Sequence, residues 1–263
     1  MSKIIKNNNP LVSVIMSSHN EADMVQTTLN KFFDRATNPD EIEIILRIDD
    51  EAQRSQDWIN SIRLCAGVER QMQITIISGP REYGYCSIPD NQKECAAVSK
   101  GEFIFGACDD IDDIDQGWDD NIRKWKGKCV LLTNIAEENT HLWDFWAFHR
   151  KIFELTETIA IVEYSNYHYP IYDKHTPQLV KNAGFKLWHQ PTANFGLSSA
   201  QGQHCARIED PNYKLNKEPY FENQEGDKWE HFAKHYVSKV IDFVKNNPEY
   251  DPNLEEIVNE DIS

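Results

Sequence analysis

Residues 101–120, with the sequence GEFIFGACDDIDDIDQGWDD, join a short apolar run to a dense group of carboxylates. Phe103 to Ala107 is a continuous apolar run of the length of one strand, and such a run is typical of a strand covered on both faces. Five aspartates then follow within seven positions: Asp109, Asp110, Asp112, Asp113 and Asp115. The stretch therefore predicts a buried central strand that delivers acidic groups to one edge of a sheet.

Carboxylates packed this closely repel one another unless a cation or solvent separates them. Mg²⁺ and Mn²⁺ suit this role, because they bind one or two carboxylates together with the phosphate oxygens of a substrate. A solvated acidic loop is the alternative interpretation, since runs of charge are usually solvated. A calcium-binding EF-hand loop that starts at Asp110 is excluded, because Asp115 and Asn121 occupy the positions that need glycine and glutamate.

The composition limits the class of protein. With 263 residues, 40% of them hydrophobic, the chain is expected to form one domain with two lobes. The formal charge of −16 argues against binding to nucleic acid or anionic membranes. No apolar run approaches the roughly 18 residues of a membrane span, and the N-terminus lacks a signal-peptide core, so a soluble, cytoplasmic protein is expected. The six cysteines include no Cys-x-x-Cys pair, which disfavours a zinc ribbon.

Strands and helices alternate in the first half of the chain. Apolar and β-branched runs predict strands at 11–17, 41–48, 73–77, 103–107 and 129–133. An apolar stripe at helical spacing predicts a helix that begins after Asn20 and ends near Pro39, and a second helix is expected at 91–99. This alternation is typical of an α/β fold with a largely parallel sheet and right-handed crossovers.

Polar groups follow the first four of the five predicted strands. They are Ser17 to Asn20, Asp49 and Asp50, Arg81, and Asp109 and Asp110. The carboxyl ends of parallel strands meet at one edge, where open α/β sheets bind ligands, so these groups are expected to converge there. The chain has neither a Gly-x-Gly-x-x-Gly motif after the first strand nor a Walker A motif, which disfavours a Rossmann dehydrogenase and a P-loop enzyme.

The second half differs in texture, being rich in aromatic residues and histidine from about residue 136. Trp143, Trp146 and Trp188 either stack on a ligand or belong to the core, where aromatic clusters are more common. An amphipathic pattern predicts a helix over 229–244, broken at Pro248. We therefore divide the chain into a first half at 1–135, a second half at 136–215 and a C-terminal helical tail at 216–263.

Three separated blocks carry a family resemblance. Residues 12–21, 42–50 and 101–110 resemble the opening of family-2 glycosyltransferases, and the series 117–119, 143–149 and 172–173 is similar in a looser way. The match is poor beyond residue 185. The resemblance implies a GT-A type, Rossmann-like fold, with a mostly parallel sheet flanked by helices, a smaller acceptor-side lobe and a C-terminal helix. It implies that 1–135 is the nucleotide-binding half and 136–215 the acceptor-binding half, and that Trp143, Trp146 and Trp188 would be the ones to stack on a sugar.

The same resemblance implies an activity. A sugar would move with inversion from a nucleotide-diphosphate donor, a UDP-sugar by expectation, to a hydroxyl of a glycan, lipid-linked or other acceptor, with Mn²⁺ or Mg²⁺ as cofactor. Ser17, His19 and Glu21 would line the pocket for the base and ribose. Asp49 would contact the uracil or the ribose. Independently of the resemblance, Arg81 either holds a phosphate or is a surface arginine.

The resemblance also implies the metal ligands and the catalytic base. Asp109 and Asp110 match the Asp-x-Asp region, although the first acidic position of the family falls on Cys108. The metal pair is therefore Asp109 with Asp110 or Asp110 with Asp112, and Asp110 belongs to both. A histidine supplies a further ligand in some relatives, and His204 or His189 would do so here. Asp173 is the expected base, with Glu163 as the rival.

Two other functions stay open at this point. A sugar-phosphate nucleotidyltransferase shares a similar core but usually has a glycine-rich basic loop after the first strand, which this chain lacks. A non-catalytic nucleotide- or glycan-binding protein on a degenerate transferase fold stays open because a cysteine replaces the first acid at position 108. Asp173 has an ordinary alternative too, as a turn residue before a helix at 177–183.

Overall fold

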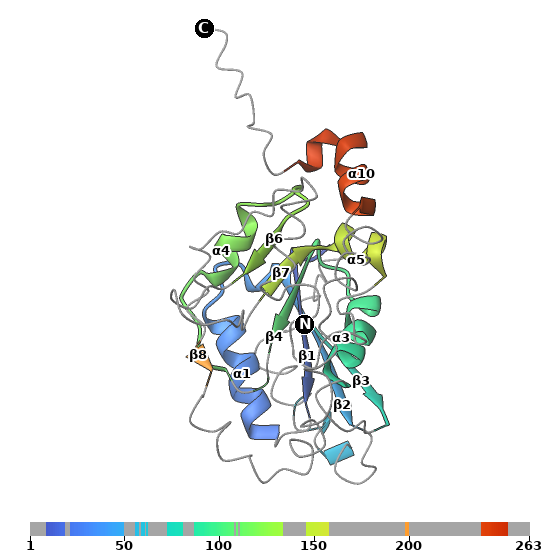
Figure 1. The fold of residues 1–263 in the computed structure, drawn as a ribbon. Coiled ribbons are helices and arrows are strands. Elements are labelled where there is room, and N and C mark those ends of the chain that lie inside the picture. The colour runs from blue at the N-terminus through green and yellow to red at the C-terminus, as the bar shows by residue number, and fades with distance from the viewer. Residues whose placement is uncertain are drawn as a thin grey trace, which may run out of the picture.

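The computed structural model describes residues 9–18, 22–49, 56–57, 59–60, 62, 73–80, 87–107, 109, 111–133, 146–157, 198–199 and 238–251. Within these ranges the predicted α/β architecture is confirmed, as a six-stranded sheet flanked by helices (Figure 1). Its four parallel strands are β1 (Val12–Ser18), β2 (Ile42–Asp49), β3 (Gln73–Gly79) and β4 (Phe103–Ala107).

The strand order is β3-β2-β1-β4-β7-β6. Strand β7 (Trp146–His149) is antiparallel to both β4 and β6 (Leu131–Thr133), so it alone runs against the other strands of this sheet. The sequence did not predict β7, because four residues without alternation carry no strand signal. Ala147 and Phe148 are fully buried, and the sheet thus continues past residue 135, where the predicted nucleotide-binding half ends.

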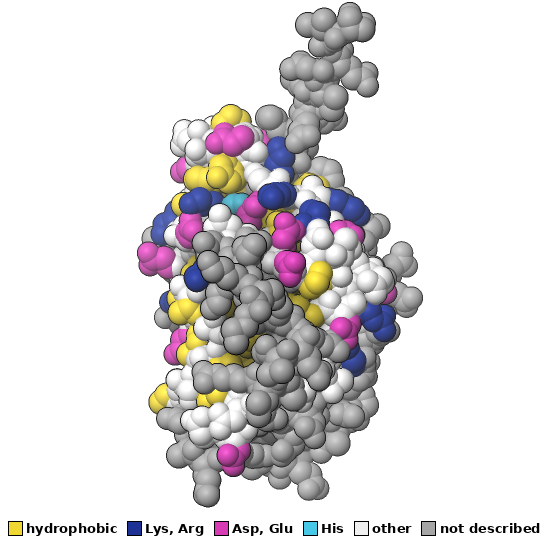
Figure 2. Space-filling model, turned by 180° about the vertical axis from the view of Figure 1, so that it is seen from behind, with side chains coloured by type: hydrophobic (Ala, Val, Ile, Leu, Met, Phe, Trp, Pro, Cys, Tyr) yellow, Lys and Arg dark blue, Asp and Glu magenta, His cyan; other side chains and the backbone are white. Residues whose placement is uncertain are grey.

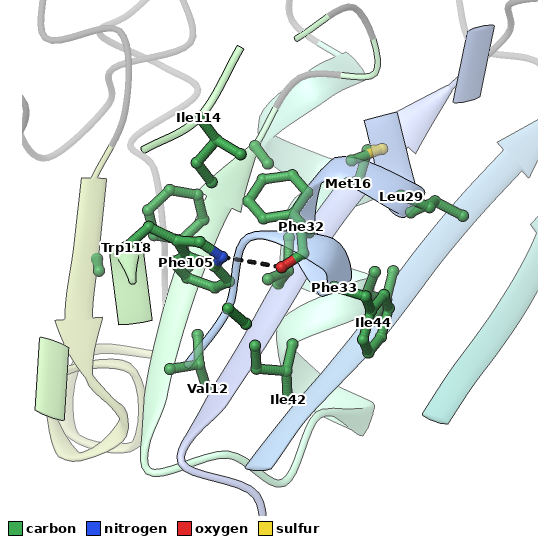
Figure 3. Close-up of a cluster of buried hydrophobic side chains, with 14 of the residues drawn as sticks. Val12, Met16, Leu29, Phe32, Phe33, Ile42, Ile44, Phe105, Ile114 and Trp118 are labelled. Carbon is green, nitrogen blue, oxygen red and sulfur yellow. Dashed lines mark hydrogen bonds between the residues drawn. The ribbon is translucent and has the colours of Figure 1, made fainter. Parts of the chain in front are cut away.

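Helices α1 (Ala22–Asp34) and α3 (Ser87–Val98) cover opposite faces of the sheet (Figure 1). On the α1 face, Phe32 packs against Phe105 and Trp118 with ring centroids 5.8 and 5.2 Å apart. The Trp118 indole also donates a hydrogen bond to the Phe32 carbonyl at 2.9 Å, and Figure 3 shows this cluster. Every residue of β4 is buried, as the apolar run at 103–107 predicts.

Helix α1 ends at Asp34, earlier than Pro39, where the sequence places the end. The reason is tertiary. The amides of Thr37 and Asn38 donate to the fully buried carboxylate of Asp119, at 2.7 and 3.0 Å, instead of continuing the helix. Asp119 belongs to α4 (Trp118–Arg123) and is paired with Arg123 at 2.8 Å, so its role is to fix the turn before the short helix η1 (Pro39–Glu41).

Three further elements lie near the amino-terminal end of β4. They are α5 (Arg150–Thr156), α10 (Ser238–Asn246) and η6 (Pro248–Tyr250), and α10 packs on α5. The amide of Cys129 donates to the Tyr250 carbonyl at 2.8 Å, which attaches the C-terminal segment to the sheet. None of the described helices combines the length and hydrophobicity that a bilayer crossing needs.

A cavity of about 690 Å³ lies at this end. Its charged lining is nearly balanced, with four basic and three acidic side chains: Lys126, Lys128, Arg150 and Lys151, and Glu102, Glu154 and Glu249. Figure 2, which views the molecule from the side opposite to that of Figure 1, shows basic side chains gathered in the upper part of the molecule, with acidic ones between them. The mixed charge favours no particular ligand, and the cavity lies away from the carboxyl ends of the parallel strands.

A buried polar network joins the amino-terminal ends of β1, β2 and β4. Glu43, only 6% exposed, accepts hydrogen bonds from the Ser13 hydroxyl at 2.6 Å and the Gly101 amide at 3.1 Å. The Gly101 amide also donates to the Ser13 hydroxyl at 2.7 Å, and Arg150 donates to the Gly101 carbonyl at 2.6 Å. Buried polar groups stabilise a fold only when they are paired in this way, so the network fixes how closely the strands approach.

His149 is expected to make the fold less stable in acid. Burial lowers the pKa of His149 from 6.5 to about 4, although Glu154 acts in the opposite direction. Glu102 lies 3.8 Å away and also favours the charged ring, but desolvation of a side chain this buried outweighs it. Between the pKa values of the unfolded and folded states, the unfolded chain binds a proton at His149 that the folded chain does not. Stability therefore falls by about 3 kcal/mol as the pH drops from 7 to 4.

Urea unfolding of the wild type and of His149→Asn at pH 7 and pH 4 measures this effect. Asparagine can keep the capping bond that His149 Nδ1 accepts from the Lys151 amide at 3.2 Å. The variant should lose about 3 kcal/mol less than the wild type over this interval. Equal losses in both proteins would contradict the assignment of the buried neutral imidazole.

Candidate active site

The carboxyl ends of the four parallel strands meet at one edge of the sheet. From β1 the chain passes to β2 and β3 on one side, and then to β4 on the other side of β1. The strand order thus reverses between β1 and β4, and open α/β sheets bind ligands at such a switch point. Ser18, Asp49 and Asp109 lie at this edge, which confirms the predicted convergence for the described part of the chain.

Asp109 connects the two strands at the switch point. Its carboxylate accepts a hydrogen bond from the Ser18 hydroxyl, and its carbonyl accepts one from the Thr28 hydroxyl at 2.9 Å. Asp109 is 8% exposed, so its orientation is set by these bonds from β1 and α1. Ser17, the other predicted serine, is half-buried in β1 and pairs with Arg47 of β2 in register.

Side chains of helix α1 donate hydrogen bonds to main-chain carbonyls of the acidic segment, the stretch that starts at Asp109 and ends at Asp115 in the sequence. Thr28, Lys31 and Arg35 recur at a spacing that places them on one helix face. They donate to the carbonyls of Asp109, Ile111 and Ile114 at 2.9, 2.8 and 3.1 Å. These bonds fix the three carbonyls and bring two positive charges to an acidic stretch. The sequence reasoning missed Lys31 and Arg35, although their spacing beside the apolar stripe was a usable signal.

A second, two-stranded sheet places part of the second half of the chain beside the acidic segment. Strand β5 (Ile111–Asp113) pairs antiparallel with β8 (Ser198–Ser199), with an irregularity in the register. The sequence predicted neither strand, because such short pairings are decided by tertiary contact. Position 204, where a histidine ligand is predicted, follows β8 by five residues in the sequence.

Asp49 ends β2, directly opposite Gly79 of β3. Its carboxylate accepts a bond of 2.5 Å from Arg47, whose guanidinium is almost completely buried. The side chain of Asp49 is 15% exposed, so this carboxylate is more accessible than the buried guanidinium with which it is paired. The prediction that Asp49 lies at the ligand-binding edge is therefore consistent with its position, while its contact with a nucleotide stays a prediction.

The other predicted site residues are placed as follows. Asp112 lies in β5, where only its main chain is described. His19, Glu21, Arg81, Asp110, Asp173 and His204 lie outside the described residues, as do Glu163 and His189. Within the described ranges no group of three potential metal ligands comes together. Cys95 and Cys129 are buried free thiols, and burial raises the pKa of each to about 12, which makes them core residues.

No family model and no curated protein matches the sequence. The structure, however, is similar to the mannosyltransferase PcManGT from Pyrobaculum calidifontis, solved in complex with GDP-Man and Mn²⁺, with a TM-score of 0.54 over 93% of this chain and 73% of that one. The chain has a GT-A type fold. This is the fold that the sequence resemblance implied, and at 14% identity the likeness is one of fold.

Two further solved structures are less similar to this chain. Residues 1–349 of TarS from S. aureus match at a TM-score of 0.44 and 11% identity, over 59% of this chain and 51% of that one. The 4-diphosphocytidyl-2C-methyl-D-erythritol synthase from Anaerococcus prevotii matches at 0.45 and 15% identity, over 79% and 99%. The chain thus spans about half the length of the TarS fragment.

Proposed function

We propose that this chain is a glycosyltransferase that moves a sugar from a nucleotide-diphosphate donor, a UDP-sugar, to an acceptor hydroxyl with inversion. The observation that carries the proposal is the acidic segment that starts at Asp109. It lies at the switch point of a GT-A fold, and α1 and β1 hold it through hydrogen bonds. The similar mannosyltransferase was solved with GDP-Man and Mn²⁺, which supports a site of this kind in this fold.

The donor set fits a hard divalent cation, Mn²⁺ or Mg²⁺. Asp110 and Asp112 would hold it, because carboxylate oxygens suit these ions and the main chain on either side of Asp110 is fixed. His204 would add a ligand. The pairing of β8 with β5 supports this, because β8 precedes His204 closely in the sequence and lies beside the acidic segment. When bound, such a cation offsets the charge that develops on the diphosphate leaving group.

The residues around the acidic segment would bind the rest of the donor. Ser17, His19 and Glu21 would line the pocket for the base and ribose, and Asp49 would accept a hydrogen bond from either. Arg81 would hold a phosphate oxygen. Asp109 would complete this side of the site, because its buried carboxylate is already oriented by Ser18.

Asp173 would act as the catalytic base. As the acceptor oxygen bonds to the anomeric carbon, the bond from that carbon to the diphosphate breaks and the acceptor proton passes to the base. Inversion requires this carboxylate on the face of the sugar opposite the leaving group. Residues 136–215, in which Asp173 lies, would bind the acceptor, and Glu163 is the alternative base within them.

Calorimetric titration of the wild type with UDP, GDP and several UDP-sugars tests the proposal, with Mn²⁺ and then with EDTA. UDP should bind with Mn²⁺ and lose most of its affinity in EDTA, since the carboxylates would hold the cation that offsets the charge of the diphosphate. A UDP-sugar that binds should also be consumed when acceptors are supplied. The release of UDP, followed over time, measures this turnover.

Three other results would point elsewhere. The absence of nucleotide binding under every condition would overturn the proposal and leave the acidic segment as a solvated surface. Tight binding without transfer or hydrolysis would favour the non-catalytic binding protein. Release of pyrophosphate from a nucleoside triphosphate and a sugar phosphate would favour the nucleotidyltransferase.

A further inference from the structure

Arg47 is a charged side chain within the apolar strand β2. It is 2% exposed and ranks among the largest fully buried side chains of the described residues. Burying a cation is costly unless it is paired, and an apolar residue of similar size often stabilises a fold as well or better. Packing alone therefore does not explain an arginine at this position, and its contacts show what it orients.

The guanidinium bridges the ends of β2 and β3. One terminal nitrogen donates to Asp49 Oδ1 at 2.5 Å and to the Ile48 carbonyl at 3.2 Å, and the other donates to the Pro80 carbonyl at 2.6 Å. Nε lies 3.6 Å from Glu94 and has no hydrogen-bond partner among the described residues. The two short bonds thus run to the strand ends at the carboxyl edge, while the contact with α3 is looser.

Gly79 makes this arrangement possible. A Cβ atom at position 79 would lie 2.8 Å from the Arg47 terminal nitrogen, closer than real Cβ contacts come. Gly79 pairs with Asp49 in the β2–β3 register, so the glycine, the acid and the arginine meet at one point. A substitution at Gly79 would therefore displace the guanidinium without changing its charge.

We propose that Arg47 is a positioning residue of the nucleotide site, which holds the Asp49 carboxylate in the orientation that accepts a hydrogen bond from the base or ribose. This rests on the proposed function, because it presupposes that Asp49 contacts the nucleotide. Arg47 and Asp49 are two residues apart and share one face of β2. Asp49 is the more exposed of the two, and hydrogen bonding to a buried partner restricts the rotamers of this partly exposed carboxylate.

The test measures UDP affinity by calorimetry and the melting temperature of each variant. Arg47→Met should weaken UDP binding about tenfold, similar to the lower end of the loss caused by removing a partner that orients a metal ligand. Arg47→Lys should recover part of the loss, since an ammonium keeps the charge but cannot bridge both strand ends. Gly79→Ala should weaken binding by displacing the guanidinium. Glu94→Gln is the matched control, because Glu94 is 56% exposed and makes no hydrogen bond to Arg47, and its affinity should stay unchanged.

A double-mutant cycle with Asp49→Asn separates positioning from general stability. If Arg47 acts through Asp49, adding Arg47→Met to Asp49→Asn should weaken UDP binding no further, although the melting temperature falls. An equal tenfold loss in both backgrounds would overturn the inference. Wild-type affinity for UDP in a folded Arg47→Met variant would also overturn it. If Arg47→Met does not fold, wild-type affinity in Gly79→Ala would overturn it instead. If the wild type itself binds no nucleotide, the proposed function fails, and the inference falls with it.

Discussion

Replacement of Asp110 by alanine is expected to lower the affinity for UDP with Mn²⁺ by more than about a hundredfold, because even the partners of metal ligands cost 10–100-fold when removed. The residues on both sides of Asp110 are tied to α1, through the Asp109 carbonyl and the Ile111 carbonyl. A neighbouring carboxylate therefore cannot easily take its place. Titration of UDP into the variant with Mn²⁺ measures the loss, which should equal that of the wild type in EDTA.

Asp115→Ala is the matched control for this substitution. Asp115 belongs to the same acidic stretch but is exposed, and it lies beyond the carbonyl of Ile114 that Arg35 binds. Its removal deletes the same charge, so UDP affinity should change little if Asp110 is a ligand. Equal losses in both variants would indicate a general effect of negative potential. A loss confined to Asp112→Ala would show that Asp110 is not the shared ligand.

Gly101→Ala is expected to destabilise the fold by more than about 4 kcal/mol, an exceptional value for one methyl group. A Cβ atom there would lie 2.5 Å from both the amide nitrogen and the hydroxyl of Ser13, and 2.8 Å from the carbonyl carbon of Val12. These are mostly main-chain atoms of β1, so relief requires β1 and β4 to separate. That movement would also break the bonds that Glu43 and Ser13 accept from the Gly101 amide.

Urea unfolding measures this loss, and the amount of soluble protein measures it where the variant does not fold. Gly127→Ala serves as the comparison, because Gly127 has a φ of +78° but no atom within 4 Å of its Cβ position. Gly127→Ala should be destabilised by only about 1–2 kcal/mol, which is the cost of a left-handed conformation for a residue with a side chain. A stability of Gly101→Ala equal to that of Gly127→Ala would mean that β1 and β4 can move apart at little cost.

The acidic segment combines features that local sequence determines with features that it does not. The sequence predicted that Asp109 follows a buried central strand and meets the ends of other parallel strands, and this is confirmed. It did not predict that α1 supplies the donors for the main chain of 109–114, because these hydrogen bonds join residues about 80 positions apart. Arg47 could have been found, since a charge inside an apolar strand is visible in the sequence.

The sequence by itself determined the four parallel strands, the helix between the first two and the edge at which their polar ends meet. These features follow from local periodicity and from β-branched composition, which act over a few residues. Only the tertiary structure decided that β7 enters the sheet between β4 and β6, and that β8 pairs with β5. It also decided which donors reach Asp49 and Asp109, because strand neighbours and side-chain partners depend on how distant segments pack, which no local pattern encodes.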